Sequence, residues 1–180
     1  MIPPETIAVV SQSPPGPAAP EPTSPVLPLL TRIDHVGIAC RDLDASIEFY
    51  VETFGLVVSG RETNEAQGVR EAMLHVNDAG DGAASYVQLL EPLSPDSPVG
   101  RFLANRGEGV HHIGYGVADV AAALAQLREA GLRLVDERPR HGSLGASIAF
   151  LHPKSLGGVL TELVQAAGKP GRAGRALLSP

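Results

Sequence analysis

The chain has 180 residues, of which 43% are hydrophobic, and a formal net charge of -6 from 20 acidic and 14 basic side chains. This length fits one domain or one duplicated domain, and the acidic balance argues against a nucleic-acid partner, because binding phosphates needs a basic surface. The single cysteine, Cys40, excludes an internal disulfide and a cysteine-rich zinc site, and it favours a reducing, cytoplasmic location.

Residues 1–30 are predicted to form a disordered leader. They hold nine of the 16 prolines, and proline lacks the amide hydrogen that helices and sheets use. No basic residue precedes Arg32, and no apolar run reaches the roughly 18 residues that cross a bilayer, so neither a signal peptide nor contact with a membrane is expected. Residues 167–180 have a similar composition and are predicted to form a flexible tail.

Residues 31–92 are predicted to form a first βαβββ module. It opens with the sequence RIDHVGIACRDLD (Arg32–Asp44), in which apolar and polar residues alternate as in a strand. Asp42 then caps a helix that ends at Gly55, where glycine accepts left-handed backbone geometry. The apolar stripe predicted for this helix consists of Ile47, Tyr50, Val51 and Phe54. Three strand-like runs follow, near Leu56–Glu62, Val69–Val76 and Ser85–Glu91.

Residues 93–108 are predicted to form a connector that contains a short helix. Ser97 is its expected N-cap, Pro98 occupies the first turn and Gly107 follows its end. This segment would join the first module to a second one.

Residues 109–166 repeat the pattern of the first module. The sequence GVHHIGYGVADVA resembles the opening of residues 31–92, and aligning His35 with His112 gives an offset of 112 − 35 = 77 residues. A helix is predicted from the cap Asp119 to Gly131, with an apolar stripe of Val120, Leu124 and Leu127. Three strands are predicted near Leu132–Arg138, Gly145–Leu151 and Gly158–Gln165. The repeat predicts an α+β fold in which duplicated βαβββ modules form one open barrel.

Each module carries two polar side chains in the middle of otherwise apolar strands. His35 and His112 lie in the first strands, and Gln88 and Glu162 lie in the last ones. Strand alternation is expected to place the histidines on the same face as Ile33, Gly37, Val110 and Gly114. An unpaired buried polar group is costly, but the cost falls if all four side chains bind one cation. Two nitrogens and two oxygens suit a divalent first-row metal, with positions left open for water or substrate.

The remaining histidines are expected to have structural roles. Alternation is expected to point His111 to the opposite face from His112. Three histidines have no counterpart in the other module and are expected on the surface or in turns: His75, His141 and His152.

The sequence closely resembles the methylmalonyl-CoA epimerases of the vicinal oxygen chelate superfamily, from about residue 30 to residue 166. The sequences that carry the resemblance are RIDHVGIACRDLD, NEAQGVREAML, YVQLLEP, GEGVHHIGYGV and FLHPKSLGGVLTELVQ. The resemblance implies a paired βαβββ barrel, a homodimer and a divalent metal. The metal ligands that it implies are His35, Gln88, His112 and Glu162. Cobalt is the metal it favours, with manganese, nickel, zinc and iron as alternatives.

The implied activity is that of an isomerase that interconverts (2R)- and (2S)-methylmalonyl-CoA. The C2 hydrogen leaves from one face and returns on the other through a metal-stabilised enolate, so the site needs a proton acceptor and a proton donor. The resemblance implies Glu71 as one base. Glu162, which is also an implied metal ligand, is the hypothesis for the other face. A bound water is the alternative there, because a metal-bound carboxylate is a weaker base.

Two features concern the acyl-CoA substrate. Related sequences carry a basic residue where this chain has Ser147, so the preference between methylmalonyl-CoA and ethylmalonyl-CoA stays open. The CoA phosphates need a local basic patch on this acidic protein, and the candidates are Arg70, Arg140 and Lys154.

Three other functions are consistent with this type of fold. A glyoxalase-type isomerase shares the metal, but it carries a second glutamate where this chain has Gln88. An extradiol dioxygenase binds iron through two histidines and one carboxylate, without a fourth protein ligand, so Gln88 argues against it. A non-catalytic drug-binding protein needs no metal ligands, so the four predicted donors argue against it. Metal analysis and an assay of C2 hydrogen exchange distinguish these alternatives.

Overall fold

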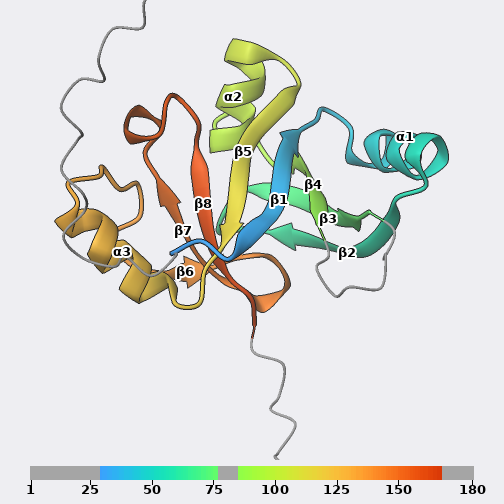
Figure 1. The fold of residues 1–180 in the computed structure, drawn as a ribbon. Coiled ribbons are helices and arrows are strands. Elements are labelled where there is room, and N and C mark those ends of the chain that lie inside the picture. Colours follow the sequence, from blue (N-terminus) through green and yellow to red (C-terminus); the bar gives the residue numbers. More distant parts are fainter. Residues whose placement is uncertain (1–28, 77–84, 168–180) are drawn as a thin grey trace, which may run out of the picture.

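The computed structural model describes residues 29–76 and 85–167, which form one mixed sheet with helices packed on it (Figure 1). The strands of the first half are β1 (Arg32–Ala39), β2 (Val57–Asn64), β3 (Val69–His75) and β4 (Tyr86–Pro92). Those of the second half are β5 (Gly109–Gly116), β6 (Arg140–His141), β7 (Ser147–Leu151) and β8 (Thr161–Gln165). The helices are α1 (Leu43–Phe54), α2 (Pro98–Arg106) and α3 (Val120–Glu129), with 3₁₀ turns η1 (Ser143–Gly145) and η2 (Pro153–Ser155).

The predicted leader and tail lie outside the described residues, except for residues 29, 30 and 167. Within the described part, none of the helices has the length and apolar character needed to cross a bilayer.

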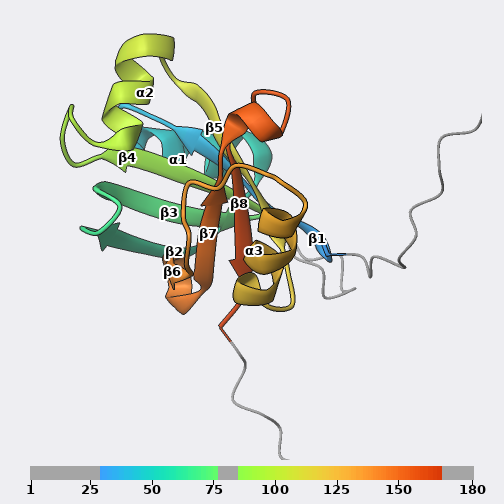
Figure 2. The ribbon, with the colours of Figure 1, turned by 90° about the vertical axis from the view of Figure 1, so that its left-hand side faces the viewer.

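The two halves of the sheet share one topology. The strand order is β2-β3-β4-β1-β5-β8-β7-β6, and β1 pairs antiparallel with β5 at the centre. In each half the first strand runs parallel to the last, β1 with β4 and β5 with β8, and the other pairs are antiparallel. In Figure 2, β2, β3 and β4 run across the direction of β7 and β8, so the sheet curls into an open half-barrel. The predicted duplicated βαβββ fold is confirmed.

The helices α1 and α3 bury one face of the sheet and leave the other face for the candidate site. α1 packs on β3 and β4, and α3 packs on β7 and β8. Leu89 on β4 belongs to the core cluster under α1, and Leu163 on β8 belongs to the one under α3. Because side chains alternate along a strand, their neighbours Gln88 and Glu162 point to the opposite side of the sheet.

The predicted helix caps are confirmed. Asp42 accepts a hydrogen bond from the backbone N–H of Ala45 at the start of α1, and Asp119 accepts one from Ala122 at the start of α3. Ser97 caps α2 in the same way. These side chains satisfy backbone donors that have no partner within the helix.

The apolar stripe predicted for α1 is only partly right. Ile47 is buried and Tyr50 is half-buried, but Val51 is 38% exposed and Phe54 is 62% exposed. The buried face instead runs through Leu43 and Ile47. The sheet therefore covers mainly the first half of the helix and Tyr50, whereas Phe49 and Phe54 face solvent.

The strand predicted near residues 132–138 is wrong. Only Leu134 forms a bridge there, to Leu151, and the edge strand β6 has two residues further along the chain. The backbone N–H groups of Val135 and Asp136 both donate to the carbonyl of Phe150, and the Asp136 carboxylate accepts the Phe150 N–H. The Asp136 side chain thus takes the place of a backbone hydrogen bond between strands. Pro139 has no N–H to donate to a neighbouring strand. For these two reasons the alternating sequence does not form a strand.

Candidate metal centre and active site

Four adjacent strands at the centre of the sheet each supply one polar side chain to the side opposite α1 and α3. In sheet order, β4 carries Gln88, β1 carries His35, β5 carries His112 and β8 carries Glu162. Each of these residues is at most 4% exposed. Each half of the chain therefore contributes two donors, one from its first strand and one from its last strand.

Three of the four side chains meet at one point. The Nε2 atoms of His35 and His112 are 3.0 Å apart, and Oε2 of Glu162 is 2.9 Å from the first and 3.3 Å from the second. Two donors that bind one ion at right angles, each at about 2.1 Å, are about 3 Å apart. The triangle thus has the dimensions of three ligands on one face of a metal ion.

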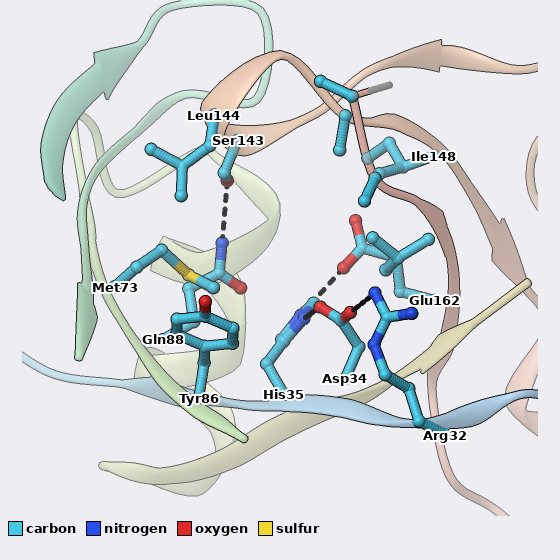
Figure 3. A pocket seen from close by; sticks show the side chains of 14 residues that line it. Arg32, Asp34, His35, Met73, Tyr86, Gln88, Ser143, Leu144, Ile148 and Glu162 are labelled. Carbon is cyan, nitrogen blue, oxygen red and sulfur yellow. Dashed lines mark hydrogen bonds and ion pairs between the residues drawn. The ribbon is translucent and has the colours of Figure 1, made fainter. Parts of the chain in front are cut away.

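The amide of Gln88 is oriented so that its oxygen has no protein partner. Its Nε2 donates to Oε2 of Glu71 at 2.6 Å and to Oγ of Ser143 at 3.0 Å. Its Oε1 is the one buried side-chain atom without a hydrogen bond among the described residues. In Figure 3 this oxygen points toward His35 and Glu162. A buried acceptor without a partner is costly, and a cation at the triangle would satisfy it.

Two glycines make room for the imidazoles. Gly37 pairs across the strands with His112, and Gly114 pairs with His35. A Cβ at Gly37 would lie 2.2 Å from Cε1 of His112, and a Cβ at Gly114 would lie 2.3 Å from Cε1 of His35. The His-x-Gly spacing in each half of the sequence therefore has a steric cause, since each glycine accommodates the other half's histidine.

The alternation predicted around His35 is interrupted by a β-bulge. Ile33 pairs with Tyr115 and His35 with the next residue, Gly114, so Asp34 is an extra residue in β1. Ile33 is 58% exposed whereas His35 is buried, and the prediction that the two share a face is wrong.

A second bulge interrupts β5 beside His112. Gly37 pairs with His112 and Ile38 with Val110, so His111 is the extra residue. The prediction that His111 points away from His112 is wrong, because the Nδ1 atoms of the two rings are 3.0 Å apart. Val110, predicted to share the face of His112, is 57% exposed.

Asp34 holds the ring of His35. Its Oδ1 lies 3.1 Å from Nδ1 of His35, and its other oxygen pairs with the guanidinium of Arg32. Burial raises the pKa of Asp34, but the hydrogen bonds from His35 and Arg32 outweigh it, so the pKa lies below its ordinary value. Asp34 is therefore a buried carboxylate that is charged at neutral pH.

The charges of the triangle stabilise one another in the protein without a metal. Burial raises the pKa of Glu162, but hydrogen bonds from His112 and His35 outweigh this and lower the pKa to about 2. Burial lowers the pKa of His35, but hydrogen bonds with Asp34 and Glu162 raise the pKa to about 9. Burial and the neighbouring His112 lower the pKa of His111 to about 4, so that ring is neutral.

Glu71 on β3 is a third buried carboxylate at the site, after Asp34 and Glu162. It is 1% exposed, and it accepts hydrogen bonds from Oγ of Ser143 at 2.8 Å and from Nε2 of Gln88 at 2.6 Å. Burial raises the pKa of Glu71 to about 7, and the neighbouring carboxylate of Glu62 acts in the same direction. A carboxylate with this pKa is suited to proton transfer at neutral pH.

A cavity of about 250 Å³ opens beside the donors (Figure 3). Its polar lining consists of Arg32, Asp34, His35, Gln88, Ser143 and Glu162. Its larger apolar and aromatic side chains are Met73, Tyr86, Leu144, Ile148 and Val164. A small ligand in this cavity can contact the donor side chains of His35, Gln88 and Glu162, and the partners of Glu71 line its wall. The arrangement suits removal of a proton from a carbon next to a carbonyl.

Ser143 has a role that the sequence did not reveal. It lies in η1, between β6 and β7, 72 residues away from its partner Glu71. Leu144, which follows it, has φ 54 and is the one non-glycine residue with positive φ in the described part of the chain. Such a backbone is unusual for leucine and is found where surrounding structure holds it. The available signal was the sequence HGSLG, whose flanking glycines indicate a tight turn.

The basic residues proposed for CoA phosphates have different surroundings. Arg70 pairs with Asp44 and Glu91. Arg140 pairs with Asp136 and lies over the ring of Phe150. Lys154 lies in the exposed turn η2.

Other residues singled out in the sequence lie at the margin of the site. Ser147 is the first residue of β7. Its neighbours Ala146 and Ile148 line the cavity, but Ser147 is not among the residues that do. As predicted, His75 ends β3 near the surface, His141 is exposed on β6 and His152 caps η2.

Comparison with known proteins agrees with this geometry. The family model of the glyoxalase/bleomycin resistance protein/dioxygenase superfamily matches residues 34–150. A solved structure of methylmalonyl-CoA epimerase in complex with methylmalonyl-CoA and NH4+ is 60% identical, with a TM-score of 0.74, and the match covers 77% of this chain and 96% of that one.

A variant of the Streptomyces coelicolor methylmalonyl-CoA epimerase, solved with 2-nitronate-propionyl-CoA, is also 60% identical, with a TM-score of 0.74 over 77% of this chain and 99% of that one. The ethylmalonyl-CoA/methylmalonyl-CoA epimerase of Cereibacter sphaeroides is 36% identical over 139 residues, which are 76% of this chain and 99% of that protein. The chain therefore belongs to the methylmalonyl-CoA epimerase family of the glyoxalase/bleomycin resistance protein/dioxygenase superfamily.

Proposed function

We propose that this protein interconverts (2R)- and (2S)-methylmalonyl-CoA by moving the hydrogen on C2 from one face to the other. The observation that carries the proposal is the buried carboxylate of Glu71, whose partners Gln88 and Ser143 line the same cavity as His35 and Glu162 of the donor triangle. A 60% identical epimerase holds methylmalonyl-CoA in its solved structure, which supports this substrate.

The residues that would hold a divalent metal are His35, Gln88, His112 and Glu162. Their fit is supported by the donor triangle and by the unpartnered oxygen of Gln88. When bound, the metal supplies a Lewis acid that stabilises negative charge developing on the thioester oxygen. One carboxylate among four ligands leaves a dipositive ion with a net positive charge, which suits that role. We propose cobalt, with manganese, nickel, zinc and iron as alternatives.

Glu71 is the proposed base on one face of C2. Ser143 and Gln88 both donate to its carboxylate, so its two oxygens are held in place before substrate arrives. The pKa of about 7 leaves Glu71 able to accept a proton and to return it near neutral pH. Glu162 is the proposed group on the other face. Its pKa of about 2 makes it the weaker base, so a bound water remains the alternative there.

The test is Glu71→Gln in metal-loaded protein. The amide keeps the size of the side chain but cannot take a proton. We expect metal content to persist, while exchange of the C2 hydrogen with solvent deuterium is lost for at least one C2 epimer of methylmalonyl-CoA. Glu129→Gln, at the exposed end of α3, is the matched control and should exchange normally. Unchanged epimerisation by Glu71→Gln would remove this residue from the mechanism.

Two parallel assays separate the neighbouring functions. Ethylmalonyl-CoA tests the acyl preference, since the Cereibacter sphaeroides relative carries both substrates in its name. A glutathione hemithioacetal tests the glyoxalase-type alternative. Turnover of the hemithioacetal without C2 exchange would favour that alternative, and neither metal binding nor turnover would favour a non-catalytic binding protein.

We also propose a homodimer in the cytoplasm. The single cysteine, Cys40, is buried and unpaired, which suits a reducing compartment. Phe49 and Phe54 are 55% and 62% exposed on α1, and exposed aromatic side chains are typical of surfaces that another chain covers. Sedimentation or light scattering of the purified protein measures the assembly, and a monomer at micromolar concentration would contradict it.

A further inference from the structure

Each imidazole of the donor triangle contacts the residue immediately before it in the sequence. On a regular strand, neighbours point to opposite faces, but the two bulges turn Asp34 toward His35 and His111 toward His112. The contacts involve the same ring atom in both halves. Oδ1 of Asp34 lies 3.1 Å from Nδ1 of His35, and Nδ1 of His111 lies 3.0 Å from Nδ1 of His112.

This ring atom determines how an imidazole binds a cation. The Nε2 atoms of His35 and His112 face the triangle, so a ring that binds through Nε2 carries its hydrogen on Nδ1. That hydrogen needs an acceptor, which fixes both the tautomer and the rotation of the ring. The two bulges provide an acceptor in each case.

The acceptor of His35 is itself held in place. Asp34 is 6% exposed, and its two oxygens are divided between Nδ1 of His35 and the guanidinium of Arg32. The candidate acceptor of His112 is the half-buried ring of His111, which packs edge-on against Phe102 of α2 with ring centroids 5.0 Å apart. A carboxylate that accepts a hydrogen bond from an imidazole polarises it more strongly than an imidazole nitrogen does.

We propose that Asp34 and His111 are positioning residues that fix the two metal-binding imidazoles and make His35 the stronger donor of the pair. This inference rests on the proposed metal site, but it concerns residues that are not among the proposed metal ligands or bases. It assigns a function to the bulges, since a regular strand at either place would leave the histidine's Nδ1–H without this partner.

The first experiment measures cobalt affinity by chelator competition and the visible absorption spectrum of the bound cobalt. Asp34→Ala should weaken cobalt binding by about 10- to 100-fold and shift the spectrum. Asp34→Asn, which keeps an oxygen acceptor without the charge, should lose less. His111→Phe keeps the ring but removes the acceptor, and it should weaken binding by about tenfold. His111→Asn, which places an oxygen near the former Nδ1, should restore much of the affinity.

The controls are Asp96→Ala and His141→Asn, which change exposed residues outside the cavity lining. Cobalt binding by the unmodified protein establishes the metal site independently. If the unmodified protein binds cobalt and all four variants bind it as tightly as the controls, the positioning role is overturned while the proposed function stands. If the unmodified protein binds no metal, both the site and this inference fall.

A second measurement needs no variant. Nitrogen-15 NMR of the zinc-loaded protein reports which ring nitrogens carry hydrogen. We expect Nδ1–H and zinc-bound Nε2 on both His35 and His112, and an unprotonated Nδ1 on His111. Zinc bound through Nδ1 of either histidine, or hydrogen on Nδ1 of His111, would overturn the assignment even if the variants failed to fold.

Discussion

The imidazole of His35 lies against Gly114 on the neighbouring strand, with Cε1 only 2.3 Å from the position that a Cβ would take. Gly114→Ala should therefore displace His35 from the triangle, because the methyl group meets a ring that is buried on all sides. We expect loss of metal binding and a destabilisation of about 1–3 kcal/mol, typical of overpacking in a core. Metal analysis and denaturant unfolding measure the two effects.

Gly60→Ala is the control for this substitution. A Cβ there would meet only Cδ2 of Leu144 at 3.0 Å, the end of a flexible side chain on the cavity rim. It should bind metal normally. Equal metal content in Gly114→Ala and Gly60→Ala would contradict the steric role of Gly114.

Ser143 favours the charged form of Glu71 and helps to orient its carboxylate. Ser143→Ala removes a donor to the Glu71 carboxylate and a partner of the Gln88 amide. Since the lost hydrogen bond stabilised the charged form, the pKa of Glu71 should rise above about 7, and exchange of the C2 hydrogen at pH 7 should slow by about tenfold. Exchange should recover toward higher pH. Ser59→Ala, on the exposed strand β2, is the control and should show neither effect. If Ser143→Ala instead lost the same fraction of exchange activity at every pH, Ser143 would have a different role.

The exchange reaction should depend on pH through Glu71. With a pKa of about 7, Glu71 is protonated and inactive as a base below that pH and ionised above it, so kcat/KM should rise between pH 6 and 8. The measurement is deuterium incorporation into one C2 epimer of methylmalonyl-CoA over this range at constant metal saturation. A rising limb centred near the ordinary glutamate value of 4.5 would contradict the assignment.

The metal-free protein should be most stable between about pH 4.5 and 6.5. The pKa of His35 is raised from 6.5 to about 9, so its stabilising effect is complete below pH 6.5 and is lost as pH rises toward 9. The pKa of Glu162 is lowered from 4.5 to about 2, so its effect is complete above pH 4.5 and is lost as pH falls toward 2. Thermal unfolding in the presence of a chelator measures the loss of stability at both low and high pH. Glu162→Gln should reduce both losses. An unchanged dependence of stability on pH would show that His35 and Glu162 do not govern it.

Much of the fold and of the donor set could be predicted because both are repeated in the sequence. Helix caps such as Asp42 and Asp119 act through hydrogen bonds to residues a few positions away, so local sequence reveals them. His35 and His112 were recognisable because a buried ring is costly in an apolar strand and occurs at the same place in both halves. The structure places them at hydrogen-bonding distance.

The remaining parts of the site depend on register and on distant contacts. The bulges at Asp34 and His111 arise from the pairing of β1 with β5, and a period-two pattern in one strand contains no information about its partner's register. Ser143 reaches Glu71 across 72 residues, so neither sequence segment indicates the other. Near Val135, two backbone hydrogen bonds to the carbonyl of Phe150 and one from its N–H to the Asp136 carboxylate replaced a strand that alternation favoured.

The halves share one topology, but they differ at a position that matters for the donor set, where Gln88 lies opposite Gly37 and Glu162 lies opposite Gly114. Two identical halves would offer a bidentate ligand two equivalent orientations related by the internal rotation. With an amide in one half and an acid in the other, the charge around a bound ion would be uneven, and the two ends of an incoming molecule would no longer be interchangeable. The single exchange of nitrogen for oxygen between these side chains thus gives a duplicated scaffold one preferred orientation for a ligand whose two ends differ.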